Sequence, residues 1–154
     1  MTTTATATST RAASTPAALS GLADAVLANP ALADLRDGLD RDTAVVRSPE
    51  SLRPFLVSAL AQQAPLLVVT ATERECEELA DELAGMYDGE VAQFPSWETL
   101  PHERLSPAAD TVGRRLQVLG AVMAGRAPRV VVAAARSVVQ PISPGAARRE
   151  PVRL

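Results

Sequence analysis

Lysine is absent from the sequence, and cysteine, histidine and aromatic residues are scarce. The single cysteine, Cys76, excludes an internal disulfide, which fits a reducing compartment. One histidine and one cysteine are too few for the common zinc sites, and they form no Ser–His–Asp or Cys–His pattern in the sequence. No apolar run approaches the about 18 residues of a membrane-spanning helix. We therefore predict no metal site, no catalytic nucleophile and no membrane span.

The charge that is present is small in total and uneven along the chain. All fifteen cations are arginine and the net charge is −3, which predicts no general attraction to nucleic acid. Eight acids and one base lie between Glu73 and Glu90, whereas eight arginines and one acid lie from Thr111 onward. Runs of this kind are most often solvated faces of helices, and a pair of opposed interaction surfaces is the alternative.

Composition divides the 154 residues into three parts. Residues 1–20 consist mainly of Thr, Ala and Ser with almost nothing to bury, and we predict a disordered tail. Residues 21–144 are predicted to form one domain around a single core. Residues 145–154 hold too few apolar side chains for an element of their own, and we interpret them as the truncated start of a following domain.

Apolar patterns within residues 21–144 predict alternating helices and strands. The run Pro65–Thr70 is continuously apolar, as in strands buried on both faces of a parallel sheet. Thr72 and Glu75 have the spacing of a capping box, and Cys76 begins the apolar stripe of the helix that follows. The alternation predicts an α/β fold in which helices flank a parallel sheet. The expected strands are 43–47, 65–70, 90–94 and 129–134, and the expected helices are 21–41 (divided at Asn29-Pro30), 54–63, 72–89, 110–125 and 136–140.

Ligands of such sheets bind at the carboxyl ends of the strands, so the loops after the four expected strands are the places to look for a site. The most distinctive loop follows Phe94. It contains the run Trp97-Glu98-Thr99-Leu100-Pro101, then Ser106-Pro107, then Asp110-Thr111-Val112-Gly113-Arg114-Arg115-Leu116. This run resembles a loop in the N-terminal module of the bacterial transcription-repair coupling factors. That module is related to the first domain of the helicase subunit of the UvrABC excision nuclease. The resemblance covers roughly residues 22–144 and implies a P-loop-NTPase-like (RecA-like) first domain.

The loop after the first expected strand decides whether nucleotide binding is expected. A functional phosphate loop needs glycines, a lysine for the β- and γ-phosphates and a Ser or Thr for Mg²⁺. Both glycines are missing here, Ser51 stands at the lysine position, and Glu50 would repel phosphate. We therefore predict a degenerate loop, no cofactor and no enzymatic activity for this chain. The resemblance places this loop at Ser48, Pro49, Glu50, Ser51 and Leu52.

Two roles are open for the loop around Trp97. In the favoured interpretation, Trp97, Leu100 and Leu105 fold back over the end of the sheet as an apolar plug, and Pro101 limits the entropy of the unfolded loop. In the other, an exposed Trp97 flanked by acids such as Glu98 anchors a partner protein.

The helix after this loop carries charged residues at informative positions. Asp110 and Arg114 have the i,i+4 spacing of a favourable ion pair. Phosphate contacts by Arg114, Arg115 and other arginines are the alternative, but no nucleic-acid motif or aromatic stacking surface accompanies them. Solvation or pairing within the chain is therefore the expected role of these arginines.

The resemblance implies a function for a parent protein more than for this chain. Coupling factors of this family are ATP-dependent DNA translocases that remove stalled RNA polymerase from damaged DNA and recruit excision repair. The implied partners are the rest of the parent chain and, through it, RNA polymerase, DNA and the damage-recognition ATPase of excision repair, all in the cytoplasm. Our leading hypothesis is a non-catalytic scaffold. The alternatives are a nucleotide-binding fragment of an excision-nuclease-type helicase and a small stand-alone adaptor.

Overall fold

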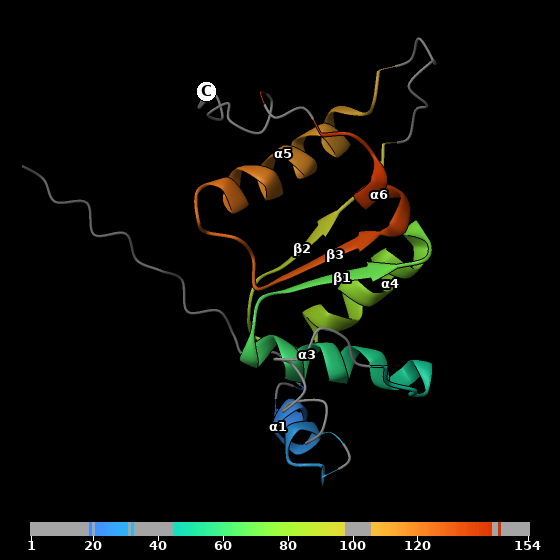
Figure 1. The fold of residues 1–154 in the computed structure, drawn as a ribbon, viewed down its shortest axis with the longest axis vertical. Coiled ribbons are helices and arrows are strands. Elements are labelled where there is room, and N and C mark those ends of the chain that lie inside the picture. The colour runs from blue at the N-terminus through green and yellow to red at the C-terminus, as the bar shows by residue number, and fades with distance from the viewer. Residues whose placement is uncertain are drawn as a thin grey trace, which may run out of the picture.

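A computed structural model describes residues 19, 21–30, 32, 45–97, 106–142 and 145 of the chain. Three strands in this part form one sheet in the order β1-β3-β2, and both pairings are parallel (Figure 1). In the register, Val130 of the central strand lies opposite both Leu66 and Val91. The predicted parallel sheet is thus confirmed. Its strands are β1 (Leu66–Thr70), β2 (Val91–Phe94) and β3 (Val130–Ala134).

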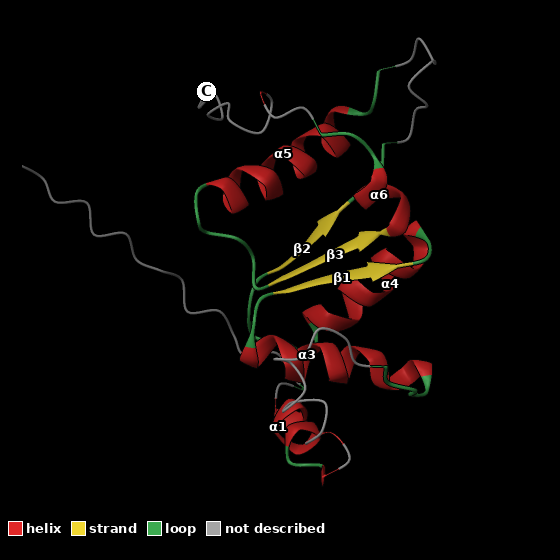
Figure 2. Cartoon of the chain, in the orientation of Figure 1, coloured by secondary structure: helices red, strands yellow, loops and turns green. Residues whose placement is uncertain are grey.

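Helices lie on both faces of the sheet, as the alternation of elements predicts (Figure 2). One face is covered by α3 (Arg53–Gln63) and α4 (Glu73–Ala84), and α1 (Gly21–Leu27) packs on the outside of α3. The other face is covered in part by α5 (Ala109–Met123), which lies over β2. A 3-10 turn, η1 (Glu50–Leu52), precedes α3, and the short α6 (Ala135–Val139) follows β3 directly. The result is an α/β fold with three layers.

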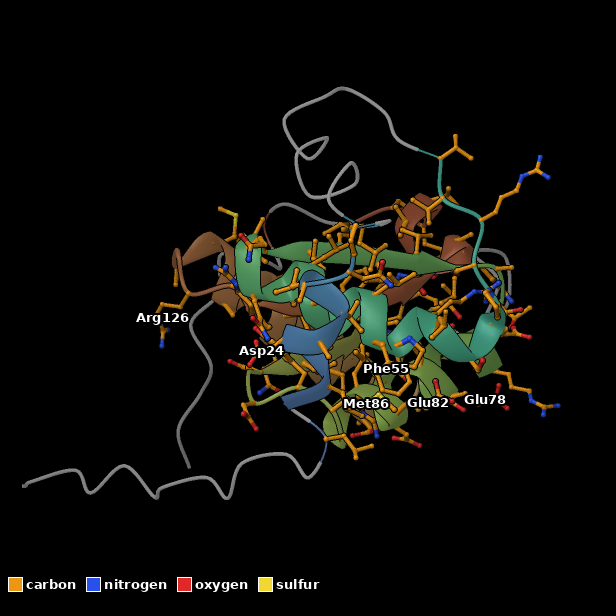
Figure 3. All side chains as sticks on the ribbon, turned by 90° about the horizontal axis from the view of Figure 1, so that it is seen from below. Asp24, Phe55, Glu78, Glu82, Met86 and Arg126 are labelled. Carbon is orange, nitrogen blue, oxygen red and sulfur yellow. The ribbon has the colours of Figure 1, made fainter. Side chains whose placement is uncertain are left out.

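The start of α4 shows why its sequence forms a helix at this point. The Thr72 hydroxyl accepts a hydrogen bond from the Glu75 N–H at 3.2 Å, which satisfies one of the free donors of the first turn. The Glu75 carboxylate in turn accepts from the N–H of Ala71, one residue before the position that a standard capping box uses. Figure 3 shows Glu78 and Glu82 on the surface of α4, where acids remain hydrated.

The core has one part on each face of the sheet. The larger part lies between the sheet and the helices α3 and α4, where Leu83, Val130 and Val132 are fully buried. The smaller part lies beneath α5 and is centred on Phe94, Val118 and Ala133. Successive residues of β3 thus point alternately into the two parts, as a strand with both faces covered requires.

Arg129 links the end of α3 to the amino-terminal ends of the strands. Its Nε donates to the carbonyl of Ala61 at 2.7 Å and its Nη2 to the carbonyl of Gln62 at 3.2 Å. These carbonyls belong to the last turn of α3, where helix carbonyls lack partners within the helix and a cation is favourable. The backbone carbonyl of Arg129 also accepts from the N–H of Leu66 at 2.9 Å. One residue therefore joins the end of α3 and the starts of β1 and β3.

The structure corrects two predictions about strands. No strand includes Val45, Val46 or Arg47, which are exposed, so the described part of the predicted strand 43–47 is absent. In β1, only alternate residues are shielded, and the side chains of Leu67 and Val69 are 60% and 51% exposed. The predicted burial of β1 on both faces is therefore wrong, because α5 lies over β2 and leaves the β1 side of that face uncovered.

The inner face of α5 also differs from the prediction. The apolar stripe predicts that Val112, Leu116, Leu119 and Met123 point inward, but Leu116 and Met123 are exposed. The buried residues are Thr111, Arg115 and Val118, because the helix is turned to place Arg115 against the end of β2. The helix ends as expected, with Gly125 at a φ of 68°, a conformation that favours glycine.

The predictions for residues 1–20 and 145–154 lie outside the described residues, apart from Leu19 and Gly145. In the part of the chain that the structure describes, no helix is long and apolar enough to cross a membrane.

Truncation of Leu83 is expected to show where the core stabilises the fold. Leu83→Ala removes a fully buried side chain and leaves a cavity, so the free energy of unfolding should fall by about 2–5 kcal/mol. Leu67→Ala, which shortens the same side chain at an exposed position, should change it by less than about 0.5 kcal/mol. Urea denaturation followed by circular dichroism measures both. Equal losses for the two variants would contradict the assignment of the core.

Titration of Cys76 is expected to make stability depend on pH in the alkaline range. Burial, reinforced by the negative charges of Glu73 and Glu77, raises the pKa of the Cys76 thiol from 9.0 to about 11. The thiol of the unfolded chain therefore ionises first, and the free energy of unfolding should fall as the pH rises from about 9 to about 11. Urea denaturation at several pH values should show a smaller fall for Cys76→Ser, whose hydroxyl does not titrate there. Identical pH profiles would contradict this role of the thiol.

Candidate functional site

Side chains from α4, α5 and the residue after α6 meet at the carboxyl end of β2. The parallel order β1-β3-β2 brings the starts of α4 and α6, which follow β1 and β3, to the edge where β2 ends. The chain continues from β2 as Pro95-Ser96-Trp97, and Trp97 is half-buried. This is the edge at which parallel sheets bind ligands. It is therefore the place to examine for a site.

Each of the three residues after β2 has its backbone bonded by a side chain from another part of the chain, namely α4, α5 and the residue that follows α6. The carbonyl of Pro95 accepts from Nη1 of Arg115, on α5. The N–H of Ser96 donates to both carboxylate oxygens of Glu73, on α4, at 3.2 and 3.3 Å. We call the side chains of Glu73, Arg115 and Gln140, together with the bonds they make to residues 95–97, the backbone clamp.

Gln140 completes the backbone clamp from the residue that follows α6. Its side-chain oxygen accepts from the N–H of Trp97 at 2.6 Å, and its side-chain nitrogen donates to the carbonyl of Trp97 at 3.3 Å. The amide thus bonds both backbone groups of one residue, as a neighbouring strand would. The direction in which the chain leaves β2 is consequently fixed at three successive residues.

Arg115 lies at the centre of this arrangement. Its side chain is only 1% exposed, and its guanidinium carbon lies 4.1 Å from the ring centre of Phe94 and 4.4 Å from that of Trp97. Burial lowers the pKa of the guanidinium, and the negative charge of Glu73 opposes this shift. Among the described residues, its Nε and Nη2 have no hydrogen-bond partner. The two aromatic contacts, each of about 0.5–2 kcal/mol, offset part of the cost of burying the charge.

The neighbouring Arg114 has a different environment. It is exposed and lies 2.8 Å from a carboxylate oxygen of Asp110, so the expected i,i+4 ion pair is present. Its Nη1 also donates to the side chain of Gln93 at 3.4 Å. An exposed pair of this kind contributes only about 0.3–0.5 kcal/mol. The structure thus brings together two of the predicted candidates, Arg115 and Trp97. Arg114 and Asp110, in contrast, lie on the solvent side of α5.

The expected phosphate loop is an exposed turn in the structure. Residues 48–52 are exposed, and the Leu52 N–H donates to the carbonyl of Pro49 at 3.0 Å, which closes the 3-10 turn. The carboxylate of Glu50 lies 3.3 Å from Arg53, the first residue of α3. The negative charge of Glu50 therefore stands close to the N-terminus of α3, the end of a helix at which phosphates bind.

The remaining candidates do not form a site in the described part of the chain. Glu98, Leu100 and Pro101 lie outside the described residues. Cys76 is buried in the core on α4. No group of three or more His, Cys, Asp or Glu residues within residues 45–97 and 106–142, or elsewhere in the described part, is placed to hold a metal ion.

Sequence reasoning missed Glu73 and Gln140. Glu73 counted as one of the outward acids of α4, and Gln140 as the end of a short helix. A signal was available, since both residues come shortly after predicted strands, and parallel strands bring such positions to one edge. The order of the strands, which decides whether these positions are neighbours, is not contained in any local pattern.

Two adjacent arginines provide a matched test of the backbone clamp. Arg115→Ala removes the aromatic contacts and the bond to Pro95 and leaves a cavity, so the free energy of unfolding should fall by about 2–4 kcal/mol. The emission of Trp97, the only tryptophan, should shift to longer wavelength as water reaches it. Arg114→Ala removes only the exposed pair with Asp110, so it should lower the free energy of unfolding by at most about 0.5 kcal/mol and leave the emission of Trp97 unchanged. Urea denaturation and fluorescence spectra measure both, and a similar response of the two variants would refute the proposed role of Arg115.

The chain is similar in sequence to two known mycobacterial proteins. No protein-family model matches the sequence. The transcription-repair-coupling factors of Mycobacterium bovis and Mycobacterium tuberculosis are each 45% identical to it in an alignment of 144 residues that covers 88% of this chain. The chain spans only 12% of the length of these relatives. The resemblance seen in the run after Phe94 is thus confirmed, and the chain is similar in sequence to the N-terminal part of a transcription-repair-coupling factor.

Proposed function

We propose that the chain is the N-terminal, non-catalytic scaffold segment of a transcription-repair-coupling factor. The identity of 45% over 88% of the chain supports the parent protein. The activity of such a parent is the ATP-dependent removal of stalled RNA polymerase at DNA lesions and the recruitment of nucleotide-excision repair. The direct partner of this segment is then the rest of its own chain. RNA polymerase, DNA and the damage-recognition ATPase of excision repair are partners of the parent, in the cytoplasm.

The observation that carries the scaffold role is the backbone clamp. In a parallel sheet with a ligand site, polar side chains at the carboxyl edge face the ligand. Here Glu73, Arg115 and Gln140 are directed instead at the backbone of residues 95–97. The positive group best suited to a phosphate, Arg115, is buried under Phe94 and Trp97. The polar groups at this end of the sheet therefore make contacts within the protein, and few of them are free to bind a nucleotide.

The turn before α3 supports the same conclusion. We infer a degenerate P-loop of RecA-like descent at residues 48–52, where neither glycine nor lysine is present. Bound phosphates would lie near the N-terminus of α3, and the carboxylate of Glu50 lies there beside Arg53. Bringing an anion to this carboxylate is unfavourable at any effective dielectric constant. A scaffold is thus favoured over the nucleotide-binding fragment. No feature of the described residues favours a stand-alone adaptor.

A titration with a fluorescent ATP analogue tests the proposed function. Energy transfer from Trp97 to N-methylanthraniloyl-ATP should show no saturable binding by the 154-residue chain up to about 1 mM, because neither the turn at residues 48–52 nor the backbone clamp offers a phosphate site. The full-length M. tuberculosis relative, which the family resemblance implies to bind ATP, serves as the positive control. Saturable binding in the micromolar range would overturn the non-catalytic assignment and favour the nucleotide-binding fragment.

A further inference from the structure

A cavity of about 330 Å³ lies at the amino-terminal ends of the strands, away from the backbone clamp. It forms where α1, α3 and the turn between α4 and β2 meet, and Asp24 and Met86 are both on the side seen in Figure 3. Its volume is at the lower end of the range for sites of small molecules, about 300–1,000 Å³. The lining includes Asp24 of α1, Ser58 and Gln62 of α3, and Met86, Tyr87 and Asp88 of the turn.

The three elements around this cavity are joined to one another. Ala23 of α1 is buried where this helix packs on α3. The N–H of Leu19, just before α1, donates to the carbonyl of Gly85 at 3.2 Å. The hydroxyl of Ser58, on α3, donates to the carbonyl of Met86 at 3.2 Å. The walls of the cavity are therefore held together by contacts on both sides of the turn.

Tyr87 gives the cavity a fixed aromatic wall. Its ring packs against the larger part of the core, and its hydroxyl donates to the carbonyl of Ala61 at 3.5 Å. A Cβ atom at Gly89 would collide with this ring, so the absence of a side chain there leaves room for it. The face of such a ring carries partial negative charge and attracts cations.

The polar groups of the lining are mainly acceptors. The carboxylates of Asp24 and Asp88 accept hydrogen bonds and carry negative charge. The Ser58 hydroxyl gives its proton to Met86, so lone pairs are what it has left to offer. No arginine is among the described residues of the lining, and the side-chain amide of Gln62 supplies the clearest donors. An anion would be repelled here, whereas a cation with several N–H groups matches the lining.

We propose that this cavity binds a guanidinium group, with Asp24 as its carboxylate partner and Tyr87 as its stacking surface. A guanidinium has five donors in one plane and a flat face that stacks on aromatic rings, so it uses both features of the lining. The same molecule shows each contact elsewhere, since Arg115 stacks on Phe94 and Arg129 bonds the last turn of α3. Two carboxylates are fewer than a calcium site uses, and the cavity is far larger than an ion. The proposal does not depend on the scaffold function.

A titration with butylguanidinium, compared with butylammonium, tests the proposal. We expect butylguanidinium to bind the 154-residue chain saturably at low salt with a Kd of about 0.1–1 mM. Butylammonium has the same chain and charge but no flat fork, so it should bind about fivefold more weakly or worse. Two-dimensional ¹H–¹⁵N NMR spectra measure both affinities, and the shifted amide signals should be those of residues 21–24, 58–62 and 86–88.

Two pairs of variants identify the groups that bind. Asp24→Asn removes the charge with little change of shape and should weaken the binding of butylguanidinium by about tenfold. Asp81→Asn makes the same change at an exposed acid of α4 outside the lining and should alter it by less than about twofold. Tyr87→Leu removes the ring and should weaken binding by about fivefold, whereas Tyr87→Phe keeps the ring and should bind normally. The dispersion of the same spectra shows that each variant is folded.

Three results would overturn the proposal. The first is the lack of saturable shifts up to about 10 mM butylguanidinium. The second is an equal loss of affinity in Asp24→Asn and Asp81→Asn, which would mean general attraction to an acidic surface. The third is equal affinity for the two probes. Binding of an ATP analogue, in contrast, would overturn the scaffold function and leave these measurements unaffected.

A third probe separates the two sources of a guanidinium, a free small molecule and an arginine side chain of a protein. N-acetylarginine N-methylamide carries the group on a peptide backbone. Tighter binding of this probe than of butylguanidinium would support the proposal with an arginine side chain as the ligand. Weaker binding would support it with a free small molecule, because the backbone would then not fit the cavity of about 330 Å³.

Discussion

The burial of one guanidinium between two aromatic rings determines how the carboxyl edge of this sheet is built. Arg115 lies between Phe94, the last residue of β2, and Trp97, and so requires α5 to turn a polar residue inward. The helix then covers β2 and β3 and leaves β1 bare. One orientation of α5 therefore has two effects. It places Arg115 against the end of β2, and it leaves half of that face of the sheet uncovered.

The arrangement also relates the turn at residues 48–52, the proposed degenerate phosphate loop, to the rest of the fold. A nucleotide site needs an accessible anion-binding loop and free polar groups at the carboxyl edge. In this chain the loop carries Glu50, and the polar groups at the edge bond the backbone after β2. Both departures support the proposed scaffold role.

The three strands and α4 were predictable because each rests on a local pattern. Apolar runs bounded by proline or glycine predicted the strands, and the stripe through Cys76 and Leu83 predicted the buried face of α4. The apolar pattern gave the wrong inner face for α5, because it predicts that an arginine points outward. Its stacking on the rings of Phe94 and Trp97 is a tertiary contact that no local pattern contains. Local patterns failed for β1 as well, because a continuous apolar run does not tell which face another element covers. Glu73 and Gln140 required the strand order, which is a tertiary property.

Arginine side chains, and not lysine side chains, stabilise both ends of the strands. Two nitrogens of the planar Arg129 guanidinium bond the end of α3, and the backbone carbonyl of the same residue bonds the start of β1. At the opposite end of the strands, Arg115 stacks on Phe94 and donates to the carbonyl of Pro95. A lysine has neither the fork nor the flat surface that these contacts use. A guanidinium also keeps its charge throughout the pH range in which proteins fold. The contacts of Arg115 and Arg129 therefore do not depend on pH. A histidine or a buried lysine at the same positions could lose its proton, and its contacts would then weaken.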